Sequence, residues 1–270
     1  AGTLRRLVAR SGEPVIRAAV MRAMRIMGRQ FVMGTTIEDA LKRAGEPDNR
    51  RYRHSFDMLG EAAHTEVDAI GDVIDVHNVI EAPGISIKLS ALHPRYEFAQ
   101  RTRVLNELAP RAQALARRAK AAGIGFTIDA EEAARLDISL DVLDALIADH
   151  DLAGWDGFGV AVQAYQKRAP HVIDWLADRA RRHKRKLMVR LVKGAYWDSE
   201  IKRGQENGID SYPVFTRKPA TDVSYIACVK RLFAVADVLY PQFATHNAHT
   251  IAVVEELAGG RAFEFQRLHG

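Results

Sequence analysis

The sequence predicts an α/β fold, a (β/α)8 barrel of the TIM type preceded by N-terminal helices. Short apolar runs alternate with longer stretches of helical periodicity, a pattern typical of parallel sheets. No G-x-G-x-x-G fingerprint follows the first strand, although an open doubly wound sheet would normally carry one there. Polar residues follow six consecutive strands, which is where a barrel gathers its functional groups.

The composition indicates a globular chain that can bury a large core. Of its 270 residues, 47% are hydrophobic and 27% charged, which excludes intrinsic disorder. The lone Cys228 excludes a disulfide scaffold and favours a reducing compartment. No apolar run approaches the roughly 18 residues of a membrane span. We therefore expect a cytoplasmic protein, and peripheral contact with the inner membrane stays open.

The charge is moderately basic. Lys and Arg number 39 against 34 Asp and Glu, a net charge of +5. The excess lies in an arginine-rich N-terminal segment and in residues 179–186 (RARRHKRK). Solvated helix faces explain both clusters more simply than a nucleic-acid site, since no DNA- or RNA-binding motif accompanies them. DNA binding by this segment is not expected.

Residues 1–50 are predicted to form an N-terminal helical segment, and residues 51–270 the barrel. Ser11 can cap a first helix that has Pro14 in its early turns. Thr36 with Asp39 resembles a capping box for a helix over Ile37–Ala44, which the Gly-Glu-Pro sequence at 45–47 ends.

The barrel region contains seven candidate strands, separated by amphipathic stretches. The predicted strands are Arg53–Leu59, Ile85–Ser90, Ile124–Asp129, Gly157–Gln163, Leu187–Lys193, Tyr240–Thr245 and Ala262–Leu268. The predicted helices are Val104–Ala122, Ser139–His150, Val172–Arg182, Ser224–Val238 and Thr250–Leu257. The seventh strand is reached shortly before Gly270, so we expect the final strand–helix unit of a barrel to be missing from this chain.

Four polar side chains at the strand ends are the strongest candidates for function. Lys88 and Arg190 lie in apolar strands, where a cation is costly unless it is paired. Asp129 could serve a site or cap the following helix with Glu132. Gln163 is equally compatible with a structural role.

Two further groups follow later strands. His246 and His249 could bind a metal with Asp129 or Glu131, but a turn that caps the next helix is the simpler explanation, so no metal is predicted. Tyr196 and Trp197 follow a glycine, Gly194, which lets the backbone approach a phosphate or a ring closely.

Long motifs in the chain resemble the flavin-dependent proline dehydrogenase family, most closely the proline dehydrogenase domain of bacterial proline utilization A proteins. The resemblance covers nearly the whole chain. It rests on GISIKLSALHPRYE (84–97), GFTIDAEEAARLD (125–137), GVAVQAYQKR (159–168), LMVRLVKGAYWDSEIK (187–202), FATHNAHT (243–250) and FEFQRLHG (263–270).

The resemblance implies a distorted barrel that holds FAD and oxidises L-proline to Δ1-pyrroline-5-carboxylate. Electrons would pass to a membrane quinone, and an aldehyde dehydrogenase domain would follow in the parent protein. It implies that Lys88, Asp129, Arg190, Tyr196 and Leu268 serve the substrate and the reaction. The implied FAD-binding residues are Asp129, Ala130, Gln163, Arg190, Val192, Lys193, Gly194, Ala195, Trp197, Thr245, His246, Asn247 and Gln266.

Some features depart from the family or leave alternatives open. The family's last helix carries an arginine pair that binds the proline carboxylate, and Glu61 resembles the glutamate that pairs with one of these arginines. That helix is absent from the sequence given. One alternative is an aldolase or lyase that uses Lys88 or Lys193 as a Schiff-base amine. Another is a non-enzymatic basic module that binds lipid or DNA.

Overall fold

The strands predicted for the barrel form a single sheet in the structure. This computed structural model describes residues 14, 16–24, 26–28, 32–34, 36–57 and 83–269. The chain divides into a larger unit, residues 52–267, and a smaller one made of residues 1–51 and 268–270. Each unit is considered by itself.

The described part of the smaller unit is helical. Residues 14, 16–24 and 26–28 are in helical conformation, and α2 spans Ile37–Ala44 as predicted. The Thr36 hydroxyl caps α2 by accepting a hydrogen bond from the Asp39 backbone N–H at 3.2 Å. The predicted cap at Ser11 lies outside the described residues. The division of the chain at residue 50 stays a prediction.

The described residues of the larger unit, 52–57 and 83–267, form seven parallel strands in the order of the sequence. They are β1 Ser55–Asp57, β2 Gly84–Ile87, β3 Gly125–Ile128, β4 Phe158–Gln163, β5 Leu187–Val192, β6 Leu239–Ala244 and β7 Glu264–Gln266. Each strand pairs with the next, from β1 to β7. A doubly wound sheet would reverse its direction at a switch point, so the uninterrupted order confirms the barrel type of winding.

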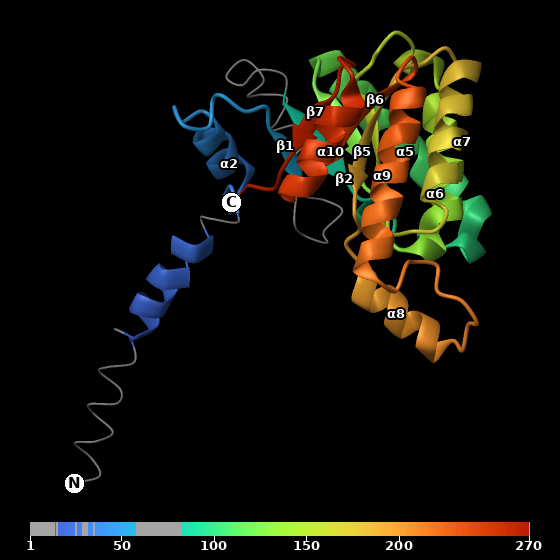
Figure 1. Cartoon of the computed structure of the whole chain (residues 1–270). Helices are drawn as coiled ribbons and strands as arrows, with labels where there is room; N and C mark the ends of the chain where they lie inside the picture. Colours follow the sequence, from blue (N-terminus) through green and yellow to red (C-terminus); the bar gives the residue numbers. More distant parts are fainter. Residues whose placement is uncertain are drawn as a thin grey trace. The chain divides into compact units, whose positions relative to one another are not determined.

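Helices connect the strands and lie outside the sheet. They are α4 Leu89–Leu92, α5 Arg101–Ala122, α6 Leu136–Ile147, α7 Ala169–Arg182, α8 Trp197–Glu206, α9 Lys218–Ala234 and α10 Ala248–Ala258. Figure 1 shows them around the strands, and consecutive pairs from α5 to α7 and from α9 to α10 pack together. In α5 the buried residues recur at helical spacing, as in Val104, Leu108, Ala112 and Leu115, so one apolar stripe faces the strands.

Several predicted boundaries are wrong by a few residues. The predicted second strand ran to Ser90, but the chain leaves β2 after Ile87 and turns into α4. Helix α8 was not predicted, and the predicted start of α9 at Ser224 misses its first turns, where Pro219 occupies an early position. Strand β1 was predicted to reach Leu59; the described part ends at Asp57.

The two faces of each strand differ in composition. On the face toward the helices, alternate residues such as Ile85, Ile87, Phe126 and Leu191 are at most 1% exposed. The opposite, inward face begins with glycine on β2, β3 and β4. A Cβ on Gly125 would lie 3.6 Å from the Met188 methyl group, so this β5 side chain fills the space that the glycine leaves.

Candidate active site

Arg190 is the centre of a polar network on the inward face. Its side chain is 14% exposed. Nε donates to Gln266 Oε1 at 2.6 Å, and Nη1 donates to Ser86 Oγ at 2.8 Å and to Asp129 Oδ1 at 3.1 Å. Nη2 donates to Ser55 Oγ at 3.1 Å. The guanidinium therefore has the planar set of acceptors that a buried arginine requires.

These contacts show that the sheet is curled. Arg190 lies on β5 and Ser55 on β1, four strand positions away. In a flat sheet these strands would be about 19 Å apart, at roughly 4.8 Å per strand. A direct hydrogen bond between their side chains requires the inward faces to turn toward each other.

Lys88 lies between two carboxylates at the carboxyl ends of β1 and β3. Its Nζ is 3.2 Å from Asp57 Oδ1 and 3.6 Å from Asp129 Oδ2. Burial, the largest influence, lowers the pKa of Lys88, but the charges of Asp57 and Asp129 outweigh it, and the net pKa is raised. The Schiff-base alternative needs an amine with a lowered pKa, so the geometry at Lys88 disfavours that reaction.

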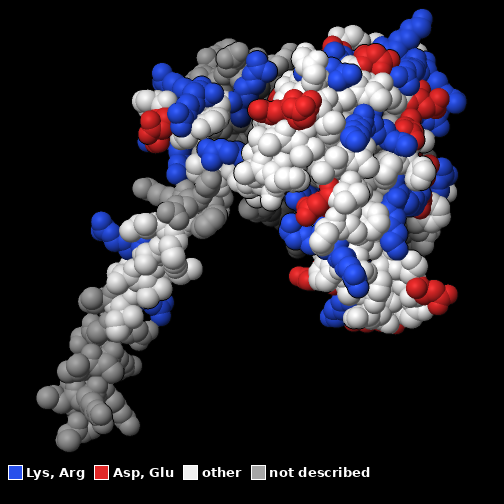
Figure 2. Space-filling view, viewed as in Figure 1, with Lys and Arg blue, Asp and Glu red and all other residues white. Residues whose placement is uncertain are grey.

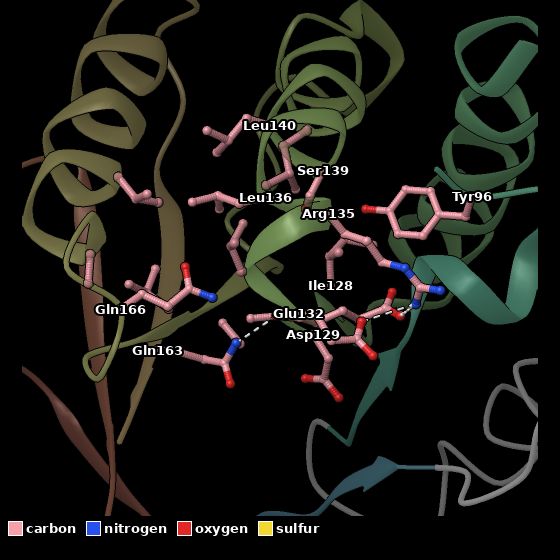
Figure 3. A pocket seen from close by; sticks show the side chains of 18 residues that line it. Tyr96, Ile128, Asp129, Glu132, Arg135, Leu136, Ser139, Leu140, Gln163 and Gln166 are labelled. Atoms are coloured by element: carbon pink, nitrogen blue, oxygen red, sulfur yellow. Dashed lines mark hydrogen bonds and ion pairs between the residues drawn. The ribbon is translucent and has the colours of Figure 1, made fainter. Parts of the chain in front are cut away.

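Asp129 serves this network and does not cap a helix. It contacts both Arg190 and Lys88, whereas the short helical turn after it, Ala133–Arg135, has Glu132 at its N-cap and no side-chain cap hydrogen bond. Burial raises the pKa of Asp129, and the nearby Arg190 charge opposes this shift. Asp129, Glu132 and Arg135 all line a small cavity between the sheet and the helices, and Figure 3 shows the Asp129 carboxylate turned away from the other two.

Gln163 joins the loop after β3 to the loop after β5. Its Nε2 donates to the Glu131 carbonyl at 2.8 Å, and its Oε1 accepts from the Ala195 backbone N–H at 3.0 Å. The Glu131 carboxylate is held by the Ser90 N–H at 3.0 Å and by Arg135 at 2.7 Å. Gln163 thus fixes the loop that contains Ala195, next to Gly194.

Gly194 packs against a ring of the protein itself. Its φ is +146°, and a Cβ there would lie 2.4 Å from the ring of Tyr165. Tyr165 is buried, and its backbone N–H donates to the Lys193 carbonyl at 2.7 Å. The glycine predicted to allow close approach therefore does so toward Tyr165.

The residues after this turn extend the site edge. Tyr196 is half-buried directly before α8, and burial raises its pKa while the Lys88 charge opposes the shift. Trp197 is 42% exposed, and its indole N–H donates to the Phe215 carbonyl at 3.0 Å. An exposed ring in a fixed orientation is suited to lie against a planar ligand.

Lys193, directly after β5, forms an ion pair with helix α9. Its Nζ contacts Asp222 of α9 at 2.5 Å, and Asp222 also contacts Lys218 at 3.1 Å. Hydrogen bonding from Lys193 lowers the pKa of Asp222. Val192 and Ala130, which were also predicted to contact the cofactor, are partly exposed.

The loop after β6 contains a cap of the next helix, which was the simpler of the two explanations for its polar residues. Asn247 caps α10, because its Oδ1 accepts from the Thr250 backbone N–H at 2.9 Å. The Thr245 hydroxyl accepts from the Asn247 N–H at 3.1 Å, and His246 is exposed. Within residues 36–57 and 83–269, no three His, Cys, Asp or Glu side chains gather as metal ligands would.

Hydrogen bonds between β6 and β7 orient Gln266, which accepts a hydrogen bond from Arg190. Glu264 Oε1 accepts from Gln266 Nε2 at 2.7 Å and from Gln242 Nε2 at 2.8 Å. Since its amide NH2 faces Glu264, Gln266 presents its oxygen to Arg190. Leu268, the remaining predicted pocket residue, belongs to the smaller unit, and Glu61 lies outside the described residues.

Five residues of this site were not predicted from the sequence. They are Ser55, Asp57, Ser86, Tyr165 and Glu264. Asp57 had a usable signal, since it follows an apolar residue near the end of the first strand, as Asp129 does after the third. The two serines had only their alternation with buried residues, a weak signal in strands this short.

One of the two basic clusters forms ion pairs on the helical surface. In residues 179–186, Arg179 contacts Asp144 at 3.2 Å, Arg181 contacts Asp237 at 3.0 Å and Arg182 contacts Asp178 at 2.8 Å. Figure 2 shows Lys and Arg interspersed with Asp and Glu over the larger unit. In the part of the chain that the structure describes, no helix has the length and apolar character to cross a bilayer.

A family model described as proline dehydrogenase matches residues 40–270. The chain belongs to the proline dehydrogenase family. A second family model, described as the DNA-binding domain of proline dehydrogenase, matches residues 1–31, the segment for which DNA binding was not expected.

Individual relatives agree with the family. The chain is 54% identical over 285 residues to the bifunctional protein PutA of Escherichia coli K12, covering 99% of this chain but 22% of that protein. It is 56% identical to a PutA variant from Bradyrhizobium japonicum of known structure, with a TM-score of 0.84, over 98% of this chain and 28% of that one. The PutA structure from Bdellovibrio bacteriovorus, at 24% identity and a TM-score of 0.87, shares the fold.

Proposed function

We propose that the site binds FAD and L-proline and catalyses the oxidation of proline to Δ1-pyrroline-5-carboxylate. The observation that carries the proposal is the arrangement of Lys88, Asp129 and Arg190 at one end of the sheet, with alternating charges in direct contact. Membership of the proline dehydrogenase family and the resemblance of the motifs around these residues support it.

The residues present fit the cofactor by their chemistry. Lys193, which is paired with Asp222, offers positive charge for a phosphate, and the partly exposed Trp197 offers a ring face. Arg190 offers a fixed cation to a ring that becomes negative on reduction. When bound, FAD supplies the acceptor for two electrons.

The protein's own groups would hold the substrate. In the oxidation, a hydride leaves the ring carbon beside the nitrogen and a proton leaves the nitrogen, so positive charge develops on the nitrogen first. Asp129 stabilises this charge and orients the ring, while Lys88 holds the carboxylate. The Arg190 network keeps its guanidinium in place without reorganisation during the reaction.

A visible spectrum tests the proposal. The protein loaded with FAD should show flavin absorbance that bleaches when proline is added without oxygen. The Δ1-pyrroline-5-carboxylate product can be trapped as a coloured adduct with an aromatic aminoaldehyde. A protein that does not bind FAD, or a flavin that proline does not bleach, would contradict the proposal.

We further propose that the electrons pass to a membrane quinone and that the protein makes peripheral membrane contact. The similarity to bifunctional PutA proteins supports an aldehyde dehydrogenase domain in the parent protein, since the chain spans 22% of that relative. Anaerobic addition of a soluble quinone should reoxidise the bleached flavin faster than molecular oxygen does.

The match of residues 1–31 to the DNA-binding domain of proline dehydrogenase runs against the expectation that this segment does not bind DNA. We propose that the segment contributes to DNA binding, which its several arginines would support through phosphate contacts. Duplex DNA should then show a mobility shift that weakens steeply as the salt concentration rises. No shift at low salt would contradict this proposal.

A further inference from the structure

The ammonium of Lys88 is shared unequally between two carboxylates. Asp57 Oδ1 and Oδ2 lie 3.2 and 3.4 Å from Nζ, whereas Asp129 Oδ2 lies 3.6 Å away. The nearer carboxylate comes from β1 and the farther one from the end of β3, on opposite sides of β2. The stronger contact therefore draws Lys88 away from Asp129.

Four charged groups follow one another across this end of the sheet. Asp57, Lys88, Asp129 and Arg190 alternate in sign, and each contacts the next within 3.6 Å. Without Asp57, the only one of these carboxylates left beside Lys88 is Asp129. The flexible lysine would then close onto Asp129, because an ammonium in a partly buried site is costly without an anionic partner.

We propose that Asp57 is a positioning residue that keeps the Lys88 ammonium from closing fully onto Asp129, so that both groups can still interact with an amino-acid substrate. This inference rests on the proposed function. Asp57 acts through its contact with Lys88 and does not itself contact the substrate.

The charges around Lys88 are consistent with this role. Asp57 from β1, Asp129 after β3 and Tyr196 before α8 influence its pKa, and Arg190 of β5 faces it across Asp129. The Asp57 charge is the largest influence that raises the pKa of Lys88. Removing this charge leaves Asp129 alone to offset the effect of burial, so the pKa of Lys88 should fall and its fraction of neutral amine should rise even if the ammonium moves closer to Asp129.

A double-mutant cycle in the flavin-loaded protein tests the proposal. We expect Asp57→Asn to lower kcat/KM for proline at least tenfold, and Asp57→Glu to recover part of that loss. In a Lys88→Met background, Asp57→Asn should change kcat/KM less than twofold, because its target is gone. Equal effects of Asp57→Asn in both backgrounds, or an effect below twofold in the wild-type background, would overturn the proposal.

A second measurement does not depend on catalysis. The rate at which acetic anhydride modifies Lys88, followed by mass spectrometry at pH 8, should rise at least threefold in Asp57→Asn. Asp141→Asn is the matched control, since it removes a carboxylate that pairs with Arg101 at 2.6 Å on the helical surface. An unchanged modification rate in Asp57→Asn contradicts the coupling to Lys88.

The two measurements separate the two hypotheses. If proline fails to bleach the wild-type flavin while Asp57→Asn still accelerates modification of Lys88, the proposed function is wrong and the pairing of Asp57 with Lys88 stands. If wild-type protein oxidises proline and neither effect of Asp57→Asn is seen, the role of Asp57 is wrong.

Discussion

The two faces of the same strands are built by different rules. On the helix face, Phe126 and Phe158 are fully buried and their rings stack at 6.4 Å. On the inward face, Arg190 bonds to groups from four separate places in the chain. Apolar contacts have little direction, so the helix face needs the right volume, whereas every donor on the inward face needs one particular acceptor. Substitutions should therefore reduce stability on one face and function on the other.

The largest effect is expected at Arg190. Arg190→Lys keeps the positive charge but loses the planar set of donors that reaches Gln266, Ser86, Asp129 and Ser55. We expect kcat for proline oxidation to fall about 10²–10³-fold. Steady-state kinetics alongside the thermal unfolding midpoint checks this. Activity within threefold of the wild type would show that the network is merely structural.

Gly194→Ala comes next. A methyl group would meet the Tyr165 ring in a backbone conformation that residues other than glycine rarely adopt. The turn must shift, so we expect the affinity for FAD to fall roughly 10- to 100-fold, about 1.4–2.7 kcal/mol. Titration of the apoprotein with FAD measures this. Gly208→Ala is a matched control, because its φ is +58° but nothing lies within 4 Å of the added Cβ.

Phe126→Leu tests the helix face. It should lower the free energy of unfolding by about 1–2 kcal/mol, since a fully buried ring is replaced by a smaller apolar group. Denaturant unfolding followed by circular dichroism measures this change, and kcat per folded molecule should remain within twofold. A large loss of kcat without a loss of stability would contradict the claim that substitutions on the helix face reduce stability rather than function.

The smallest effect concerns Asp222, whose pKa is lowered by Lys193. A lowered pKa in the folded state adds stability above the unfolded value of about 3.9 and loses it as the pH falls through the folded value. Because Asp222 is 37% exposed, Asp222→Asn should cost about 0.5–1 kcal/mol at pH 7. The difference from the wild type should shrink when the pH is lowered from 7 to below the unfolded value of about 3.9. Urea unfolding at both pH values measures it, and an equal difference at both would contradict the ion-pair explanation.

Much of the fold follows from local patterns. The alternation of apolar strands and amphipathic helices located each of the described strands within a few residues, and the Thr36 cap was found from its spacing to Asp39. The ends of strands were less accurate, because the chain leaves the ladder while its residues remain apolar. Helix α8 was missed because its charged sequence buries mainly Glu200 and Gly204 rather than an apolar stripe.

The sequence by itself determined that charged groups stand at strand ends, and the motifs around Lys88, Asp129 and Arg190 indicated the family. Only the tertiary structure decided which groups meet. Ser55 and Arg190 are 135 residues apart, and Glu264 orients Gln266 from the neighbouring inward position. Such partners carry no local signature, because they are chosen by the curvature of the sheet and by the direction of each hydrogen bond.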